Sequence, residues 1–298
     1  MNVTWMADYN FLATLAGGAE MSDREAFLYG LRKERNNMQL INPESAKSIS
    51  VENTDLFVVS NAVRFNLQQL MNTVAKKPCV IYIHDYWPLC MYRLFYPMQE
   101  KCKKCKNIGN AKQLLLNSVL NIFLSPLHFD AWCFAIPELK DHPHHIHPSP
   151  VNLDLFKPMP DVKRNPKAGL VVSPAAFKGV KNTMGYCEKH PEITFTVVGG
   201  QPPGVKMPRN CAFVGSIPTP KMPGMFAQAS YYVELPDTPQ PFNRTILEAR
   251  LMEVPHLIVN KNLGAVSYHW FKKDTKTIRK HISEAVPKWW KAVEGVMQ

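Results

Sequence analysis

The 298-residue chain lacks the features that would assign it at once to a membrane or secreted class. It has no run of about 18 apolar residues, the length that a membrane-spanning helix needs. No basic segment precedes an apolar stretch at the N-terminus, where Asp8 interrupts the apolar residues early, so we predict no signal peptide. The seven cysteines follow no regular framework, which favours a cytoplasmic protein, in the host cytoplasm if a virus encodes it.

Acidic residues are fewer than basic residues. The chain has 24 Asp and Glu against 35 Lys and Arg, a formal net charge of +11. This excess favours an anionic partner, and a nucleic acid, a phospholipid surface and a nucleotide all qualify; the alternative is a solubilising surface. With 46% hydrophobic and 20% charged residues, the composition is that of a folded protein, and the length suits two domains.

The chain begins with a strand pattern at residues 2–6, a glycine pair at Gly17 and Gly18, and a helix pattern through residue 32. This order is typical of a Rossmann-like domain, but the glycines do not form a G-x-G-x-x-G fingerprint, so a dinucleotide cofactor is poorly supported. Apolar runs at residues 55–61 and 79–84 predict parallel strands. The second run ends at His84 and Asp85, where open α/β sheets place ligand-binding groups.

The most informative stretch is residues 239–249, PQPFNRTILEA. A strand pattern at residues 230–235 precedes it, and residues 245–252 have helical spacing. A strand, a turn and a helix start aim unpaired backbone N–H groups at one place, which suits a phosphate or another anion. Another strand pattern and a glycine turn follow at residues 256–265.

This stretch resembles the donor-binding signature of retaining nucleotide-sugar glycosyltransferases of family 4, which have the GT-B fold. Their pattern is Glu-x-Phe-Gly-x-x-x-x-Glu-Ala, and Phe242 and Glu248 match it, with Ala249 after them. Gln240 replaces the first acid and Asn243 replaces the glycine. The resemblance implies that Glu248 holds the ribose and that Gln240 lies by the transferred sugar. The alternative is an ordinary amphipathic helix with a surface glutamate.

Other segments are similar to the same family in the same order. Lys178 lies in a Lys-Gly element whose lysine neutralises the donor pyrophosphate in the family, and Gly199 ends a strand-glycine element. The family's arginine is missing at residues 173–176, a contact that Lys181 or Arg244 could supply. Residues 134–137 are similar to a short strand of the same family. The resemblance assigns donor binding to Gly17, Gly18, Lys178, Gly199, Phe242, Asn243, Arg244, Thr245 and Glu248.

The segment His84-Asp85-Tyr86-Trp87 also resembles the N-terminal domain of this family. His84 could contact the sugar or the acceptor, and Asp85 could orient its ring or help to receive an acceptor proton. Together with Gln240, these residues are the catalytic candidates; a histidine at a strand end is as often a purely structural, hydrogen-bonded group.

Cys90, Cys102 and Cys105 have the spacing C-x11-C-x2-C among lysines. A C-x2-C pair is half of a zinc site, so these cysteines are a weak candidate for structural zinc without an evident fourth ligand. The lysines of this loop could instead meet acceptor phosphates, or only face solvent.

The predicted fold class is therefore α/β, a GT-B fold of two Rossmann-like domains that face each other across a cleft. We expect an N-terminal acceptor-side domain at 1–157 and a donor domain at 158–282. A C-terminal helix at 283–298 is expected to pack back on the N-terminal domain.

The resemblance implies transfer of a hexosyl or pentosyl group from a nucleotide-diphosphate sugar, with UDP-sugar favoured, to an acceptor hydroxyl with retention of configuration. It implies no required cofactor and no catalytic metal. Basic composition slightly favours hydroxymethylated bases in DNA as acceptor, as in virus-encoded DNA modification. The alternatives are a lipid-linked saccharide or surface polysaccharide at a membrane surface, and a catalytically silent GT-B protein that binds nucleic acid or a partner. The oligomeric state stays open.

Overall fold

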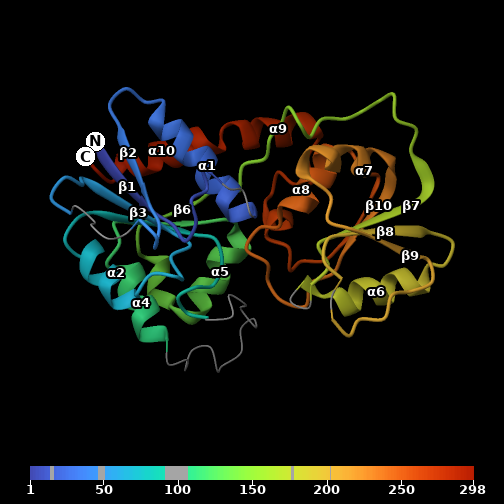
Figure 1. Cartoon of the computed structure of the whole chain (residues 1–298), viewed down its shortest axis with the longest axis horizontal. Coiled ribbons are helices and arrows are strands. Elements are labelled where there is room, and N and C mark those ends of the chain that lie inside the picture. Colours follow the sequence, from blue (N-terminus) through green and yellow to red (C-terminus); the bar gives the residue numbers. More distant parts are fainter. Residues whose placement is uncertain (14–16, 46–50, 91–106, 176–177, 202) are drawn as a thin grey trace. The chain divides into compact units, whose positions relative to one another are not determined.

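The computed structural model describes residues 1–13, 17–45, 51–90, 107–175, 178–201 and 203–298 (Figure 1). Within them the chain forms two compact units, Met1–Pro150 with Glu284–Gln298, and Val151–Ser283. No helix in the described residues is long and apolar enough to cross a bilayer.

The first unit is a parallel sheet of six strands in the order β2-β1-β3-β4-β5-β6. Its elements are β1 (Asn2–Met6), α1 (Gly18–Leu31), β2 (Asn37–Ile41), β3 (Leu56–Ser60), α2 (Leu67–Val74), β4 (Cys79–Ile83), α4 (Ile108–Leu116), β5 (Leu120–Phe123), α5 (Pro126–Ala135), β6 (His144–Ile146) and α10 (Ala285–Gly295). All five residues of β3 and of β4 are buried, as expected for central parallel strands covered on both faces.

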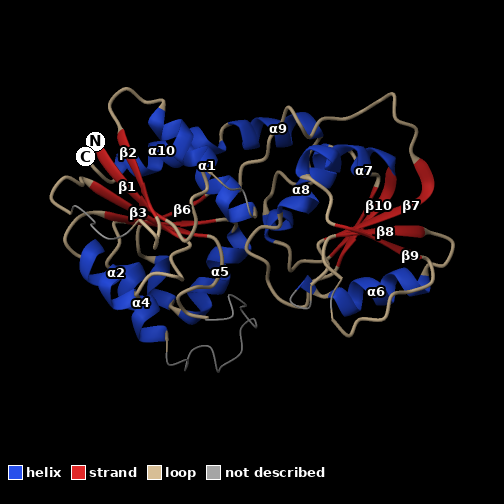
Figure 2. Ribbon diagram, viewed as in Figure 1, coloured by secondary structure: helices blue, strands red, loops and turns tan. Residues whose placement is uncertain are grey.

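Helices α1 and α10 cover one face of this sheet, and α2, α4 and α5 cover the other (Figure 2). On the first face, Trp5 stacks on Trp289 of α10 at a centroid distance of 5.4 Å. The indole N–H of Trp290 donates a hydrogen bond to the Ala26 carbonyl of α1 at 2.7 Å. Burial of these large aromatic side chains supplies much of the apolar contact on this face.

The second unit is a parallel sheet of five strands in the order β11-β10-β7-β8-β9. Its elements are β7 (Asn165–Val172), α6 (Val180–Lys189), β8 (Thr194–Val198), β9 (Cys211–Gly215), α7 (Met222–Gln228), β10 (Ala229–Glu234), α8 (Arg244–Leu251), β11 (His256–Val259) and α9 (Thr275–Ser283). Side chains of β7, β8, β10 and α6 form a buried core, among them Val171, Val197, Val233 and Met184.

Two local predictions change in the structure. The expected short strand at residues 134–137 is wrong, because α5 continues to Ala135 and a 3-10 turn covers Pro137–Lys140. Ser125 caps α5 by accepting the backbone N–H of His128, and Pro126 occupies its first turn, both features that start a helix. The edge strand β2 was not anticipated, since only its last residue is buried.

The contact between α1 and α10 predicts a steric effect at Gly30. A Cβ added there would lie 2.1 Å from Cζ2 of Trp290, a ring that is fully buried and held by its hydrogen bond to Ala26. We expect Gly30→Ala to lower the free energy of unfolding of this unit by about 1–3 kcal/mol, the usual cost of overpacking.

Native-state hydrogen exchange of α1 and β1 amides measures this effect. The matched control is Gly109→Ala in α4, where a Cβ would meet no atom within 4 Å; it should leave stability unchanged or raise it by up to about 1 kcal/mol. Equal exchange rates in the two variants would contradict the packing described for Gly30.

Candidate functional site

The second sheet has a topological switch point between β7 and β10. The chain leaves β7 toward α6 and β8 on one side, and leaves β10 toward α8 and β11 on the other. Open α/β sheets bind ligands outside the carboxyl ends of the strands at such a point. The loops after β7 and β10 are therefore the first place to look for a binding site.

These two loops touch at Gly179. Its φ is +65°, and an added Cβ would lie 2.0 Å from the carbonyl oxygen of Leu235. Only glycine allows both the left-handed backbone and this approach. Two hydrogen bonds fix the contact: the N–H of Leu235 donates to Oγ1 of Thr183 at 3.1 Å, and Asn182 donates to the Leu235 carbonyl at 3.4 Å.

Helix α6 begins directly after Gly179, and no side chain caps its N-terminus. The first N–H groups of a helix and the positive end of its dipole favour an anion there. Lys178, half-buried, immediately precedes this turn. The start of α6 thus combines a lysine with an uncapped helix end, an arrangement suited to phosphate.

The start of α8 is different, because the Asn243 side chain caps it. Oδ1 of Asn243 accepts the N–H of Ile246 at 3.3 Å and the hydroxyl of Thr245 at 2.7 Å, while its amide donates to the buried Glu234. The sequence predicts unpaired backbone N–H groups at this helix start. The prediction is wrong for Ile246, whose N–H is paired with the Asn243 side chain. Asn243 has φ +69°, a positive value that glycine adopts freely and that asparagine tolerates better than most other residues.

Glu248 is a buried carboxylate in α8, 7% exposed. Nε of Arg244 lies 3.7 Å from its Oε1, one helical turn away. Burial raises the pKa of Glu248, and the charges of Arg244 and Lys178 oppose that rise. Lys178 follows β7 and Glu248 lies in α8, which follows β10, and at the switch point the charge of the lysine acts on the carboxylate.

Backbone hydrogen bonds join Gln240 and Phe242 to the segment that follows β11. The N–H of Gln240 donates to the Asn262 carbonyl at 2.7 Å, and the N–H of Ala265 donates to the Phe242 carbonyl at 2.6 Å. The Gln240 side chain is buried, and its amide donates to the carbonyl of Thr238 at 3.2 Å. Hydrogen bonds therefore hold this loop at its backbone, against residues 262–265, and at the Gln240 side chain.

Gly199 lies at the carboxyl end of β8, next to the end of β7. It has φ +119°, and an added Cβ would lie 2.9 Å from Cα of Ser173 at the end of β7. Its N–H donates to the Gly215 carbonyl at 2.8 Å. The carboxyl ends of three strands meet here, so this glycine also serves a close backbone approach.

In the first unit, His84 follows β4 and forms a hydrogen bond with Asp23 of α1, with 2.8 Å between Nε2 and Oδ1. Ser60, at the end of β3, donates to the other Asp23 oxygen at 2.6 Å. Sequence reasoning missed Asp23. The signal was present: Asp23 shares the buried face of α1 with Ala26, Phe27 and Gly30, a helical spacing that puts an acid among apolar residues.

Asp85 takes a different place from the one expected for a residue that orients His84. Its Oδ1 accepts the N–H of Trp87 at 2.8 Å, and its carbonyl oxygen lies 3.0 Å from Nε2 of His128. Burial lowers the pKa of His128 to about 3, so this ring is neutral and supports the turn after β4. Asp23, rather than Asp85, bonds Nε2 of the His84 ring.

The structure defines the surroundings of the remaining candidate residues in less detail. Gly17 and Gly18 start α1, with Gly17 as an extended N-cap and no side-chain cap. Cys90 is half-buried and free, while Cys102 and Cys105 lie outside the described residues. Within the residues that the structure describes, no group of three or more His, Cys, Asp or Glu side chains is arranged to hold a metal ion.

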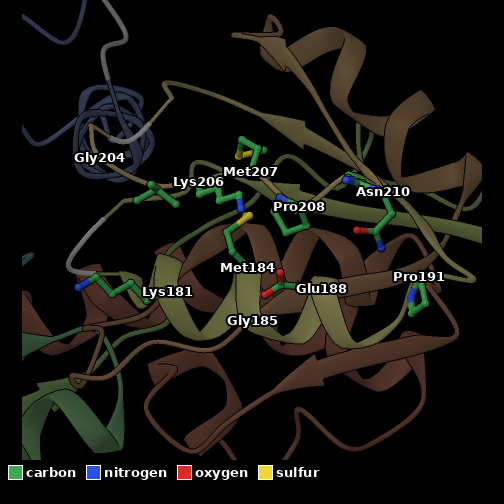
Figure 3. A pocket seen from close by; sticks show the side chains of 12 residues that line it. Lys181, Met184, Gly185, Glu188, Pro191, Gly204, Lys206, Met207, Pro208 and Asn210 are labelled. Carbon is green, nitrogen blue, oxygen red and sulfur yellow. The ribbon is translucent and has the colours of Figure 1, made fainter.

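A groove of about 680 Å³ runs along the flank of α6 beside residues 204–210. The side chains of Met184 and Glu188 project from the helix toward that loop, and Lys181 lies at the end nearest Gly204 (Figure 3). Pro191 and Asn210 line the opposite end, close to where β8 and β9 begin. The groove therefore lies beside the switch point rather than at it.

No protein-family model and no curated protein matches the chain. Solved structures match over nearly its whole length. Sucrose-phosphate synthase from Thermosynechococcus elongatus has a TM-score of 0.68 at 12% identity and covers 98% of this chain and 96% of its own. HepE of Anabaena, in complex with UDP-glucose, has a TM-score of 0.61 at 15% identity, with 98% and 91% covered. The chain has the GT-B fold.

The lipopolysaccharide outer core galactosyltransferase WaaB has the same architecture, with a TM-score of 0.59 at 12% identity and 99% of each chain covered. At sequence identities of 12–15%, the similarity to these structures establishes the fold alone. Together with the two parallel sheets, they confirm the predicted α/β class with two Rossmann-like units of GT-B type.

The burial of Glu248 predicts a pH-dependent stability. Because burial raises its pKa, the folded state binds this proton more tightly than the unfolded state. Stability therefore falls as pH rises from the unfolded pKa of about 4.3 to the higher folded pKa, and the loss persists above it. Glu248→Gln has no proton to lose, so we expect it to unfold with a free energy on the order of 1 kcal/mol higher at about pH 8 and nearly equal at about pH 4.

Hydrogen exchange of β10 and α8 amides at both pH values measures this difference within the second unit. The control is Glu188→Gln on the exposed side of α6, which removes an exposed carboxylate of the same unit and should leave the exchange of β10 and α8 amides unchanged. A Glu248→Gln variant that is less stable than the unmodified protein at the higher pH would refute the assignment.

Proposed function

We propose that the protein is a nucleotide-sugar-dependent glycosyltransferase that binds its donor at the switch point of the second unit. The observation that carries this proposal is the convergence of Lys178, Glu248 and Arg244 where Gly179 brings two loops together. Similarity in fold to HepE in complex with UDP-glucose supports a UDP-sugar as donor.

Each residue has a chemical role in this proposal. A carboxylate accepts two hydrogen bonds from the vicinal hydroxyls of a ribose, and Glu248 is the buried carboxylate at the site. Lys178 and the uncapped start of α6 neutralise the pyrophosphate, whose negative charge grows as the sugar–phosphate bond breaks. The amide of Gln240 faces hydroxyls of the sugar without adding charge.

We further propose retention of the anomeric configuration, on the resemblance of residues 240–249 to the retaining family. For the acceptor we favour a polyanion, hydroxymethylated bases in DNA, because the chain carries a net charge of +11. A lipid-linked saccharide is the second candidate. A silent binding protein is the third, favoured by the neutral Gln240 in place of an acid.

Calorimetric titration with UDP, GDP, ADP and their sugar conjugates tests the donor site. We expect saturable binding of UDP and UDP-glucose, weakened about 10–100-fold by Lys178→Ala and by Glu248→Ala, because each removes hydrogen bonds to a charged group. Lys189→Ala, at the exposed far end of α6, is the matched control and should bind normally. Absence of binding by every nucleotide would exclude the transferase function.

Salt dependence tests the acceptor. If DNA is the polyanion, log K for a duplex containing hydroxymethylated bases should fall linearly with log salt, with a slope set by the number of phosphates contacted. Anionic vesicles should bind no more tightly than neutral ones. A preference for anionic vesicles without duplex binding would move the assignment to a lipid-linked acceptor.

A further inference from the structure

The loop at residues 235–242 begins after Glu234 and ends before Asn243, and a side-chain hydrogen bond joins these two residues. Glu234 is the last residue of β10, and Asn243 directly precedes α8. The amide of Asn243 donates to Oε1 of Glu234. This bond therefore closes, at its base, the loop that contains Gln240 and Phe242.

The second oxygen of Glu234 is engaged as well. Tyr232 of β10 donates its hydroxyl to Oε2. Burial, together with the charge of Glu234, raises the pKa of this tyrosine well above its usual range, so the hydroxyl keeps its proton. Tyr232 is fully buried and Glu234 is 4% exposed. A carboxylate bonded at both oxygens inside the protein keeps one position at the end of β10.

These bonds decide which way the amide of Asn243 faces. Carboxylate oxygens accept hydrogen bonds, so the NH₂ group of Asn243 faces Glu234. Its Oδ1 then faces α8, where it accepts the N–H of Ile246 at 3.3 Å and the hydroxyl of Thr245 at 2.7 Å. In the opposite orientation the NH₂ group would meet the Ile246 N–H, and Oδ1 would meet the carboxylate. Glu234 thus selects the orientation in which Asn243 caps the helix.

The backbone of Asn243 depends on this support. Its φ of +69° and ψ of 94° lie outside the regions that residues with a Cβ usually adopt. Such a conformation persists only where the surrounding contacts hold it. The side chain supplies these contacts, bonded to Glu234 on one side and to α8 on the other. Arg244 and Glu248 follow in α8, so their positions depend on this turn.

We propose that Glu234 is a positioning residue for the donor site: through Asn243 it holds the start of α8, and with it Arg244 and Glu248, in place for a nucleotide. Glu234 acts as a hydrogen-bond acceptor within the protein and does not touch the ligand. The role toward the donor rests on the glycosyltransferase function proposed above. The hydrogen bonds do not depend on that function, so the two can be tested separately.

Hydrogen exchange in the ¹⁵N-labelled protein without ligand tests the hydrogen bonds. We expect the side-chain NH₂ of Asn243 to exchange about tenfold more slowly than that of Asn152. Asn152 is exposed in the same unit, and its side-chain oxygen accepts backbone N–H groups, whereas its NH₂ group bonds no residue in the described part of the chain. Equal exchange of the two NH₂ groups would overturn the proposal, whether or not any variant folds.

Substitutions at Glu234 separate its hydrogen bonds from its charge. Glu234→Ala removes both, and we expect the affinity for UDP to fall about tenfold while the N–H of Ile246 exchanges faster, because Asn243 is released. Glu234→Gln keeps an oxygen for Asn243 and offers its NH₂ group to the Tyr232 oxygen, so both measurements should stay within about twofold. A loss in Glu234→Gln as large as that in Glu234→Ala would overturn the role as a hydrogen-bond acceptor.

The matched control is Glu188→Ala, which removes an exposed acid of the same unit from α6. It should change neither the affinity for UDP nor the exchange of Ile246. A tenfold loss of affinity in this variant would show that any acid of the unit has the same effect, and would overturn the assignment to Glu234.

Asn243→Gly tests whether Glu234 acts through Asn243. Glycine adopts this φ without strain and offers no side chain to Glu234. Glu234→Ala should therefore weaken UDP binding by less than about twofold in the Asn243→Gly background, and an equal loss in both backgrounds would overturn the route through Asn243. UDP binding with an unprotected Asn243 NH₂ would overturn this inference alone, whereas a protected NH₂ without binding of any nucleotide would refute the proposed function.

Discussion

The close approach of Gly179 to Leu235 is the constraint on which the second unit depends. Helices α6 and α8 lie on opposite faces of the sheet (Figure 2), so the loops that start them leave β7 and β10 in different directions. Charges at the two helix starts converge only if these loops first meet. The absence of a Cβ at Gly179 permits the contact, with 2.0 Å between the position of that atom and the Leu235 carbonyl.

Burial of Glu248 carries an electrostatic cost. Glu248 is buried, and its pKa is raised even though Arg244 and Lys178 act to lower it. Desolvation thus outweighs both cations, which is the usual balance for a buried ion pair with imperfect geometry. In the proposed function, this buried carboxylate, whose charge is not fully compensated within the protein, receives its further hydrogen-bond donors from the ribose of the nucleotide.

Much of this fold could be predicted from the sequence because buried parallel strands form short apolar runs that end in polar residues. Residues 79–84 and 230–235 are examples, and they form β4 and β10, which are interior strands of their sheets. The electrostatic influence of Lys178 on Glu248 could not be predicted in this way, because it depends on a backbone approach at Gly179. The edge strand β2 was missed since exposure weakens its apolar pattern.

Asp23 was missed for a related reason. An acid in a helix is usually exposed, and only its place among Ala26, Phe27 and Gly30 indicated otherwise. The roles that the family pattern assigns to its residues stay predictions, whereas the hydrogen-bonded group that tertiary contacts between α1, β3 and β4 assemble is contained in no local pattern.

The two departures from the family signature have different physical consequences. Asn243 adopts φ +69°, and its side chain caps α8 while it bonds Glu234, so two side-chain hydrogen bonds hold this turn in place. Gln240 keeps the place of an acid but not its charge, and its amide is already engaged with Thr238. In the proposed function, Gln240 therefore brings no negative charge to the sugar, and stabilisation of positive charge that develops on the sugar comes from other groups.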